Sequence, residues 1–379
     1  MTPSAGDETL TRAATMALAS VVEPGSGQLL TQVRDYGPVE VWSFLLRTSA
    51  DSALAERARR YRPAVMQRDM HRHGLRFLVP GDPEWPAGVD DLAWSGPVGD
   101  VTGGAPLGLW VAGPGNLRDL TTRSVAMVGS RSSTATGDVV TVDLSAGVAE
   151  RGVTVVSGGA YGIDAAAHRG ALSTDGATIA VMAGGLDEVY PSGNAPLLER
   201  VRDEFLLVSE NPPNQRPSRV RFLARNRLIA ALGQATVVVE AQVRSGARNT
   251  VAWAHSLQRQ VLAVPGAVTS SQSETPNQLI RDGEATLVTC AAHILEALAP
   301  LGDPAPRPET PTLPIDGLSP GQKAVHEAFP ARSARSVDEL AYDARVNVRE
   351  CMAALTVLEM RGLALPTDDG RWRLVRQPR

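Results

Sequence analysis

The sequence predicts an α/β protein whose central domain is a doubly wound parallel sheet, preceded by an α-helical domain and followed by a winged-helix domain. Between residues 124 and 298, short runs rich in β-branched residues alternate with segments of helical periodicity. The runs are apolar throughout, which is typical of strands buried on both faces, and their alternation with helices indicates a parallel sheet. A proline-rich stretch and a small unit of three helices and a hairpin come after it.

The first 75 residues predict the α-helical domain. Apolar residues recur at helical spacing from Ser4 to Val22 and again from Val39 to Arg60. The turn-forming segment EPGSG at 23–27 separates the two stretches. We therefore expect several short helices here.

Residues 76–123 are expected to connect this domain to the sheet. From Pro80 to Pro114 the segment is rich in Pro, Gly and Asp, which are residues of turns and irregular backbone. It contains one short apolar run, LGLWVAG at 107–113, that predicts a strand.

The central domain, residues 124–298, predicts seven strands and the helices that follow them, as in repeated β-α units. The strands are expected at SVAMV (124–128), VTVVS (153–157), ATIAVM (177–182), FLLVSE (205–210), ATVVVEA (235–241), QVLAV (260–264) and TLVT (286–289). The helices are expected up to Glu150, from Gly162, near Ala195, from Ala224, from Ala247, near Gln278 and over Ala291–Leu298.

Residues 299–318 predict a linker and residues 319–379 a winged helix. The stretch 299–320 holds seven prolines, and chains of that composition form semi-rigid spacers. The unit after it predicts helices from Pro320, over 336–342 and over 347–361. The hairpin LALPTDDGRWRLV follows, with DDG as its turn.

Composition narrows the class of protein. The two cysteines, Cys290 and Cys351, form no paired motif, so the sequence predicts neither a disulfide framework nor a zinc site, and no metal is expected. No apolar run is long enough to span a bilayer, and no signal peptide is recognisable at Met1. A cytoplasmic protein without a membrane partner is expected.

Arginines cluster in the stretch from Pro212 to Arg248 of a chain that is acidic overall. The net charge is -4 and the sole lysine is Lys323; biased base composition of the genome would explain the general preference for arginine. Between Pro212 and Arg248, however, seven arginines accompany a single acid, Glu240. The stretch predicts an anion-binding patch. Its arginines are residues 216, 219, 221, 225, 227, 244 and 248.

Four glycine-containing turns follow strands of the predicted sheet: VGSRSS at 128–133, SGGAYGID at 157–164, MAGGLD at 182–187 and VRSGARNT at 243–250. Because parallel strands end at one edge, we expect these turns to lie side by side. Their free N–H groups could there hold successive phosphates of a polyanion. Each turn taken alone is explained as well by a tight connection from strand to helix.

Two common nucleotide sites are excluded. The chain has no GxxxxGK[ST] motif, whose lysine clamps phosphate in P-loop ATPases. It has GGxxG at Gly158, Gly159 and Gly162 in place of GxGxxG, and no acid ends the strand ATIAVM to hold a ribose. A nicotinamide enzyme is therefore not expected, and neither is any other cofactor.

No catalytic residues are expected. The serines of the turns lack the GxSxG elbow of serine hydrolases. His168 and His255 lie inside predicted helices and are interpreted as structural. Asp164 suits a cap or first helical turn, and Glu240 could pair with an arginine of the patch. The acids near strand ends do not have the spacing of a metal site: Asp164, Asp187, Glu210 and Glu240.

An aromatic residue, Phe222, lies among Arg219, Arg221, Arg225 and Arg227. A ring flanked by guanidinium groups suits a single-stranded nucleic acid, whose bases stack and whose phosphates need partners. A hydrophobic staple that packs onto the following helix explains Phe222 equally well.

Eight motifs cover the central domain in order. They are VAMVGSR (125–131), SGGAYGIDAAAHRGAL (157–172), GGLDEVYPSGN (184–194), LLVSENPP (206–213), FLARNRLIAAL (222–232), VVVEAQVRSGA (237–247), VLAVPG (261–266) and NQLIRDGEA (277–285). Together they resemble the DNA-processing protein A family, DprA, also called Smf. The helical N-terminal region (SAM-like) and the winged helix fit the architecture of that family.

The resemblance implies an extended Rossmann-like domain that binds single-stranded DNA without hydrolysing it, in a protein that is not an enzyme. It also implies a homodimer that protects single strands and loads the RecA recombinase onto them, in natural transformation or in recombination and repair. The DNA-binding residues that it implies are Gly129, Ser130, Arg131, Ser157, Gly158, Gly159, Arg219, Phe222, Arg225, Asn226, Arg244, Ser245 and Gly246.

The sequence departs from the family pattern in places. Tyr161 stands where many members have a basic or larger residue, and it could stack on a base or fill space. FLARNR replaces FPxRNR, and SGARNT replaces SGSLIT, which bears on the packing of the local helices.

Two other hypotheses remain. One is a nucleotide-processing enzyme of the lysine-decarboxylase-like phosphoribohydrolase group, although SGGAYGID lacks the threonine and the downstream glutamate of the motif PGGxGTxxE. The other makes the winged helix a reader of duplex DNA. Its longer helix balances two arginines against two glutamates, so a role in protein contacts is at least as compatible: Arg349, Arg361, Glu350 and Glu359.

Overall fold

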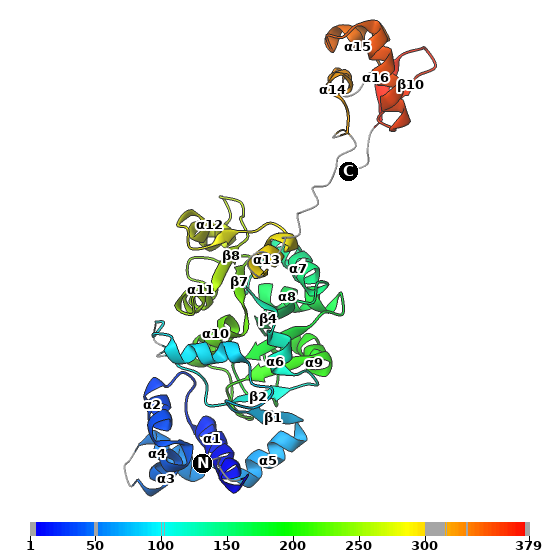
Figure 1. Cartoon of the computed structure of the whole chain (residues 1–379). Coiled ribbons are helices and arrows are strands. Elements are labelled where there is room, and N and C mark those ends of the chain that lie inside the picture. Colours follow the sequence, from blue (N-terminus) through cyan, green and yellow to red (C-terminus); the bar gives the residue numbers. More distant parts are fainter. Residues whose placement is uncertain are drawn as a thin grey trace. The chain divides into compact units, whose positions relative to one another are not determined.

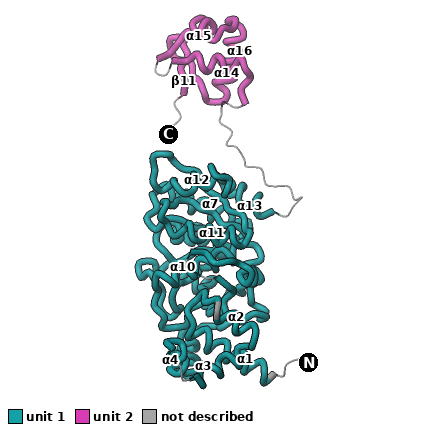
Figure 2. Tube along the Cα trace, turned by 90° about the vertical axis from the view of Figure 1, so that its left-hand side faces the viewer, with its two compact units in different colours: residues 1–307 teal, residues 308–379 magenta. Residues whose placement is uncertain are grey.

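The computed structural model describes residues 5–48, 52–99, 101, 103–299, 315, 317–330 and 333–375. The chain divides into two compact units, residues 1–307 and 308–379 (Figure 2). Each unit has hydrophobic clusters of its own. The linker predicted at 299–318 lies largely outside the described residues.

Five short helices begin the first unit. The core of the first four joins Leu18, Leu29, Val41 and Leu45, whereas the fifth packs in the cluster that contains Leu75 and Phe77. A glycine with a φ of +81° follows the second helix, and a proline begins the third, where its missing N–H is not needed. The stretch predicted at 39–60 therefore comprises parts of two helices, and the second and fifth helices were not predicted. The five are α1 (Ala5–Val21), α2 (Gly27–Tyr36), α3 (Pro38–Arg47), α4 (Ala53–Arg60) and α5 (Pro63–Arg72).

A nine-stranded sheet forms the centre of the first unit, in the order β1-β2-β6-β5-β4-β3-β7-β8-β9 (Figure 1). Neighbours from β6 to β9 are parallel, which confirms the predicted parallel sheet. The edge formed by β1 and β2 is antiparallel. The strands are β1 (Leu75–Leu78), β2 (Leu109–Ala112), β3 (Ser124–Val128), β4 (Thr154–Gly158), β5 (Thr178–Met182), β6 (Leu206–Ser209), β7 (Ala235–Val238), β8 (Gln260–Ala263) and β9 (Thr286–Leu287).

The connecting region contributes more to the sheet than its composition predicts. Strand β1 was not predicted because Arg76 interrupts its apolar sequence, LRFL. It pairs with β2 so that Phe77 lies opposite Trp110, and the centroids of the two rings are 4.6 Å apart. The same region forms the 3-10 helix η1 (Ala87–Trp94) and the short helix α6 (Leu117–Thr121).

Helices cover both faces of the sheet. Along β3, Val125 and Met127 point to one face and Ala126 and Val128 to the other, as the alternation of a strand requires. Helices α7, α8 and α13 pack on the first face, and α10, α11 and α12 on the second. None of the described helices is long and apolar enough to cross a membrane. Their bounds are α7 (Ala135–Ala149), α8 (Ile163–Leu172), α9 (Ala195–Glu204), α10 (Arg219–Leu232), α11 (Ala247–Ser256), α12 (Glu274–Arg281) and α13 (Ala291–Leu298).

The second unit has the predicted winged-helix order of three helices and a hairpin. Ser319, Ser336 and Asn347 each cap a helix with reciprocal hydrogen bonds to the residue three positions on. The core includes Leu340 and Leu355, both fully buried. Its elements are α14 (Pro320–Glu327), α15 (Val337–Asp343), α16 (Val348–Met360), β10 (Ala364–Pro366) and β11 (Trp372–Leu374).

Candidate functional site

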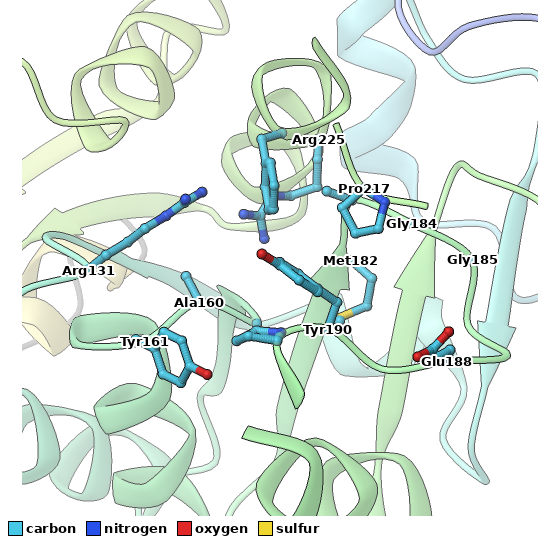
Figure 3. Close-up of a pocket in the computed structure, with 14 residues that line it drawn as sticks. Arg131, Ala160, Tyr161, Met182, Gly184, Gly185, Glu188, Tyr190, Pro217 and Arg225 are labelled. Atoms are coloured by element: carbon cyan, nitrogen blue, oxygen red, sulfur yellow. The ribbon is translucent and has the colours of Figure 1, made fainter. Parts of the chain in front are cut away.

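The carboxyl ends of the central strands carry two adjoining cavities, and the four glycine-containing turns meet there as predicted. The larger cavity has a volume of about 570 Å³ and is lined by the turns after β3 and β7 and by the start of α10. The smaller is lined by the turns after β4 and β5 and by the same part of α10 (Figure 3). Arg131, Phe222 and Arg225 line both cavities and therefore stand at their junction.

Helix α10 presents one side to both cavities. It begins at Arg219, five residues before the predicted start, because Ser218 caps it by accepting a hydrogen bond from the N–H of Arg221. At 3.6 residues per turn, Arg219, Phe222 and Asn226 lie on one side of the helix. All three line the larger cavity.

The ring of Phe222 is half-buried between charged and aromatic neighbours. The guanidinium carbon of Arg131 lies 4.6 Å from the ring centroid and that of Arg225 lies 5.9 Å from it. The Tyr190 ring is 6.1 Å away. Phe222 and Pro217 occupy the staple positions around the cap, and both line the smaller cavity. The ring is therefore placed to support the helix start and to offer a surface to a ligand.

Arg225 is buried, yet its guanidinium reaches both cavities. Its Nη1 donates a hydrogen bond to the carbonyl oxygen of Val181 over 2.6 Å. Burial lowers the pKa of the Arg225 guanidinium and raises the pKa of the nearby Asp164 carboxyl, and the attraction between the two charges opposes both shifts. Among the described residues, Nε of Arg225 has no hydrogen-bond partner.

Two predicted site residues, Ser157 and Gly158, line neither cavity. The Ser157 hydroxyl donates a hydrogen bond to the carbonyl oxygen of Met127 over 2.6 Å. A Cβ added at Gly158 would overlap the guanidinium of Arg225 and the carboxylate of Asp164. These two residues therefore position neighbours. The other predicted residues line one cavity or both: Gly129, Ser130, Arg131, Gly159, Arg219, Phe222, Arg225, Asn226, Arg244, Ser245 and Gly246.

The arginine-rich stretch does not form one surface patch. Arg227 is fully buried, and its Nη2 donates to both carboxylate oxygens of Glu210, at 2.6 and 2.7 Å. Arg221 binds Glu23, at 3.0 Å for both contacts, and Arg248 reaches Gln278. The prediction of a single patch was wrong in this respect, because sequence proximity does not show which side of a helix a residue occupies. The exposed arginines of the stretch are Arg216, Arg219 and Arg244.

Glu240 holds the turn after β3 in place. Its carboxylate accepts hydrogen bonds from the N–H and the hydroxyl of Thr134, at 2.8 and 2.7 Å. Its carbonyl oxygen accepts a bond from the N–H of Ser130 over 2.6 Å. The predicted pairing of Glu240 with an arginine of the patch is not found among the described contacts. Glu240 instead fixes the Ser130–Arg131 turn against the end of β7.

Sequence reasoning missed Tyr190, which lines the smaller cavity together with Tyr161. Both tyrosines are about half exposed, at 51% and 49%. In Figure 3 the hydroxyl end of Tyr190 points toward the guanidinium of Arg225. The motif GGLDEVYPSGN contains Tyr190, but nothing in that motif alone indicates that the ring faces a ligand site.

His168 is an internal residue. It is fully buried, and its Nε2 donates to the carbonyl oxygen of Gly158 over 2.8 Å. Burial lowers the pKa of His168 to about 4, so the ring is neutral at pH 7, and Nδ1 lies 2.7 Å from the hydroxyl oxygen of Thr178. Within the described residues, no group of three or more His, Cys, Asp and Glu side chains could hold a metal ion.

Comparisons with known proteins converge on one family. A family model described as "DNA recombination-mediator protein A" matches residues 76–299, and one described as "DprA winged helix domain" matches residues 303–370. The chain is 44% identical, over 364 residues, to a "Putative DNA processing protein DprA" of Mycobacterium tuberculosis (strain ATCC 25618 / H37Rv). That match covers 95% of this chain and 93% of the relative.

Two solved structures are similar to the described fold. DNA processing protein A from Streptococcus pneumoniae superposes with a TM-score of 0.61 at 27% identity, over 78% of this chain and 98% of that one. DNA processing protein A from Helicobacter pylori superposes with a TM-score of 0.50 at 26% identity, over 59% of this chain and 95% of that one. The Helicobacter structure was described for its "unique single-stranded DNA binding mode".

Proposed function

The chain belongs to the DNA-processing protein A (DprA/Smf) family, and from that premise we propose that it binds single-stranded DNA at the two cavities without cleaving it. The observation that carries the proposal is the meeting of Arg131, Phe222 and Arg225 at the junction of the cavities. Guanidinium groups pair with phosphates, and an aromatic ring stacks on any base. A single strand presents both groups within one nucleotide.

The larger cavity is assigned to the sugar-phosphate backbone. The exposed side chains of Arg131, Arg219 and Arg244 supply positive charge around it. Gly246 directly precedes α11, and the positive end of that helix dipole favours an anion. Gly129 leaves no room for a side chain, since a Cβ there would overlap Ile163 and the backbone of Glu240. The glycine therefore lets the turn pack closely against α8 and the segment that follows β7.

The smaller cavity is assigned to a base. Its wall combines the rings of Phe222, Tyr190 and Tyr161 with Met182 and Pro217. Such a surface stacks or packs on the flat face of a base and carries little information about which base is present. Duplex DNA keeps its bases paired inside the helix, so this cavity would favour single strands.

The proposal is tested by measuring fluorescence anisotropy of labelled single-stranded and duplex oligonucleotides. We expect affinity for single strands that falls with salt, with a log–log slope of about -0.7 per phosphate neutralised. Arg131→Ala should weaken binding to every sequence. Arg151→Ala should leave binding unchanged, because Arg151 precedes β4 and lies at the amino ends of the strands, away from the cavities. Equal binding of Arg131→Ala and the parent, or equal affinity for duplex and single strand, would contradict the proposal.

We further propose that the protein acts as a homodimer that protects single strands and loads the RecA recombinase onto them. Support comes from the description of the matching family model as a recombination mediator. Light scattering would measure the mass in solution. RecA filament formation on strands already covered by a single-strand binding protein would be followed with and without the chain, and no acceleration would contradict the loading role.

We assign the binding of single strands to residues 124–298 and a different role to the winged helix of residues 319–379. The exposed side of α16 carries Met352 and Met360, which suit a protein contact better than the groove of DNA. A chain that ends at residue 316 should keep its affinity for single strands. Loss of that affinity would place part of the site in the winged helix.

A further inference from the structure

A second arginine-rich segment lies in the helical region that precedes the sheet. Residues 57–76 hold seven arginines and one acid, Asp69, in a chain whose net charge is -4. The arginines of the α4 part are occupied locally: Arg57 pairs with Glu23, Arg60 pairs with Glu56, and Arg59 donates to the carbonyl oxygen of Thr48. Arg76 pairs with Glu84, and Arg62 donates to the carbonyl oxygens of Arg59 and Tyr61. The remaining two arginines of the segment belong to α5.

Helix α5 carries two exposed arginines, Arg68 and Arg72. Neither has a hydrogen bond or an ion pair within the part of the chain that the structure describes. Residues four apart lie on the same side of a helix, so the two guanidinium groups share one side of α5. Lone arginines on a helix are ordinary solvated charges, so the position of α5 decides what this pair can do.

Hydrogen bonds connect helix α5 to the loops that follow β5 and β6, at one end of the smaller cavity. The Asp69 carboxylate accepts a hydrogen bond from the side-chain amide of Asn214 over 2.8 Å. The N–H of Asn214 donates to Asp187 over 2.8 Å, and the neighbouring Gln215 accepts from the N–H of Gly185, also over 2.8 Å. Gly185 lines the smaller cavity. A short chain of contacts thus joins α5 to this end of the cavity.

The side of α5 that carries the two arginines is next to the side that carries Asp69. Asp69 and Arg72 are three residues apart and are therefore neighbours on the helix surface. Arg68 directly precedes Asp69 in the sequence. Met70, on the buried side, packs in the cluster that contains Leu186, one residue before Asp187. Figure 1 shows α5 beside β1, at the end of the sheet opposite β8. Arg68 and Arg72 therefore flank the same loops from the helical region.

We propose that α5 extends the DNA path, with Arg68 and Arg72 binding phosphates of the strand as it leaves the smaller cavity past Gly185. The inference rests on the proposed function of the cavities. The carboxylate of Glu188 is exposed at this end of the cavity and disfavours a phosphate beside it. The next phosphates of the strand then meet the paired positive charge of α5.

The inference is tested with oligodeoxythymidylates of increasing length, from about 4 to about 16 nucleotides, the range of site sizes found for single-strand binding folds. We compare the full chain with the double variant Arg68→Ala/Arg72→Ala. The matched control Arg118→Ala/Arg151→Ala removes two exposed arginines that precede β3 and β4 and so lie at the amino ends of the strands. All substitutions are at exposed positions, and circular dichroism melts check that each variant is folded.

We expect the double variant to bind the shortest oligomers like the parent and the longest about ten-fold more weakly. For long oligomers the log–log plot of its affinity against salt should be less steep by about 1.4, which corresponds to two phosphates at about 0.7 each. The control should follow the parent at every length. Unchanged affinity for long oligomers overturns the role of α5, and so does an equal loss at every length. If the parent itself fails to bind any single strand, the proposed function fails instead, and the two failures are distinct.

Discussion

The Nη1 atom of Arg225 donates a hydrogen bond to the carbonyl oxygen of Val181 over 2.6 Å, so that a side chain of α10 is tied to the end of β5. One nitrogen of the guanidinium is thereby fixed, and the group still lines both cavities. A lysine in this position has one ammonium group and cannot reproduce the fork of an arginine. The side chain is therefore suited both to hold the wall of the site and to meet a phosphate.

Arg225→Lys should lose most of the affinity for single strands although the charge is kept. Hydrogen bonds to charged groups contribute about 1.5–3 kcal/mol, so a loss of about ten-fold or more is expected in anisotropy titrations. Arg118→Lys, an exposed arginine at the other edge, serves as the control. Full affinity in Arg225→Lys would show that only the charge of this residue matters.

Phe222→Ala should weaken binding of single strands by about 1–3 kcal/mol, since a base would lose its stacking surface. Phe222→Leu keeps apolar volume at the staple position but has no aromatic face. If the ring acts mainly as a staple, the leucine variant will recover both stability and affinity. If it stacks on a base, the leucine variant will recover the melting temperature and not the affinity. Phe44→Ala is the control, because it removes an exposed aromatic ring outside the two cavities.

Gly158→Ala should disturb the site indirectly, by displacing the side chain of Arg225. The added Cβ would overlap Arg225 and Asp164, whose positions are fixed by burial. We expect overpacking to cost about 1–3 kcal/mol of folding free energy. It should also lower DNA affinity, because Arg225 must move. Gly96→Ala is the matched control, since no atom lies within 4 Å of the added Cβ. A melting temperature equal in both variants would show that Arg225 adapts freely.

Arg227→Met should destabilise the first unit by about 3–5 kcal/mol, because it leaves the carboxylate of Glu210 buried without its partner. Burial already raises the pKa of Glu210, and Arg227 is what counters that shift. The double variant Glu210→Gln/Arg227→Met should recover much of the loss. Chemical denaturation measures both, and a double variant no more stable than the single one would contradict this account.

The stability of the first unit should fall in mild acid because of His168. Its folded pKa of about 4 lies below the ordinary value of 6.5, so between these two values the unfolded chain binds a proton that the folded protein does not. The free energy of unfolding should therefore decrease by about 3 kcal/mol as the pH falls from about 6.5 to about 4, and stay level above that range. His168→Gln should flatten the profile, whereas His255→Gln, at an exposed position, should leave its slope unchanged.

Much of the fold was predictable because its signals are local. The apolar runs of β3 to β8 and the turns after them follow from the composition of short segments, and Ser319, Ser336 and Asn347 announce the helices that they cap. Strand β1 gave no such signal, since Arg76 interrupts the apolar run of LRFL.

The candidate site was predictable by motif and less so by arrangement. The sequence indicates which residues are glycines, arginines or aromatics, but burial depends on contacts across the fold. Arg225 and Arg227 are two residues apart, yet one lines the cavities and the other is sealed against Glu210. Ser157 and Gly158 fit the motif, and their contacts are internal.

The carboxylate of Glu23 receives Arg57 from α4 and Arg221 from the first turn of α10. Burial raises the pKa of Glu23, but the hydrogen bonds and charges of the two arginines outweigh it and lower the pKa overall. The turn between α1 and α2 thereby acts as a bracket for the helix that carries Phe222. An evolutionary exchange of the N-terminal helices between relatives would thus have to carry a matching residue for Arg221. The helical region is in this sense a co-inherited support of the helix that lines the cavities and not an interchangeable module.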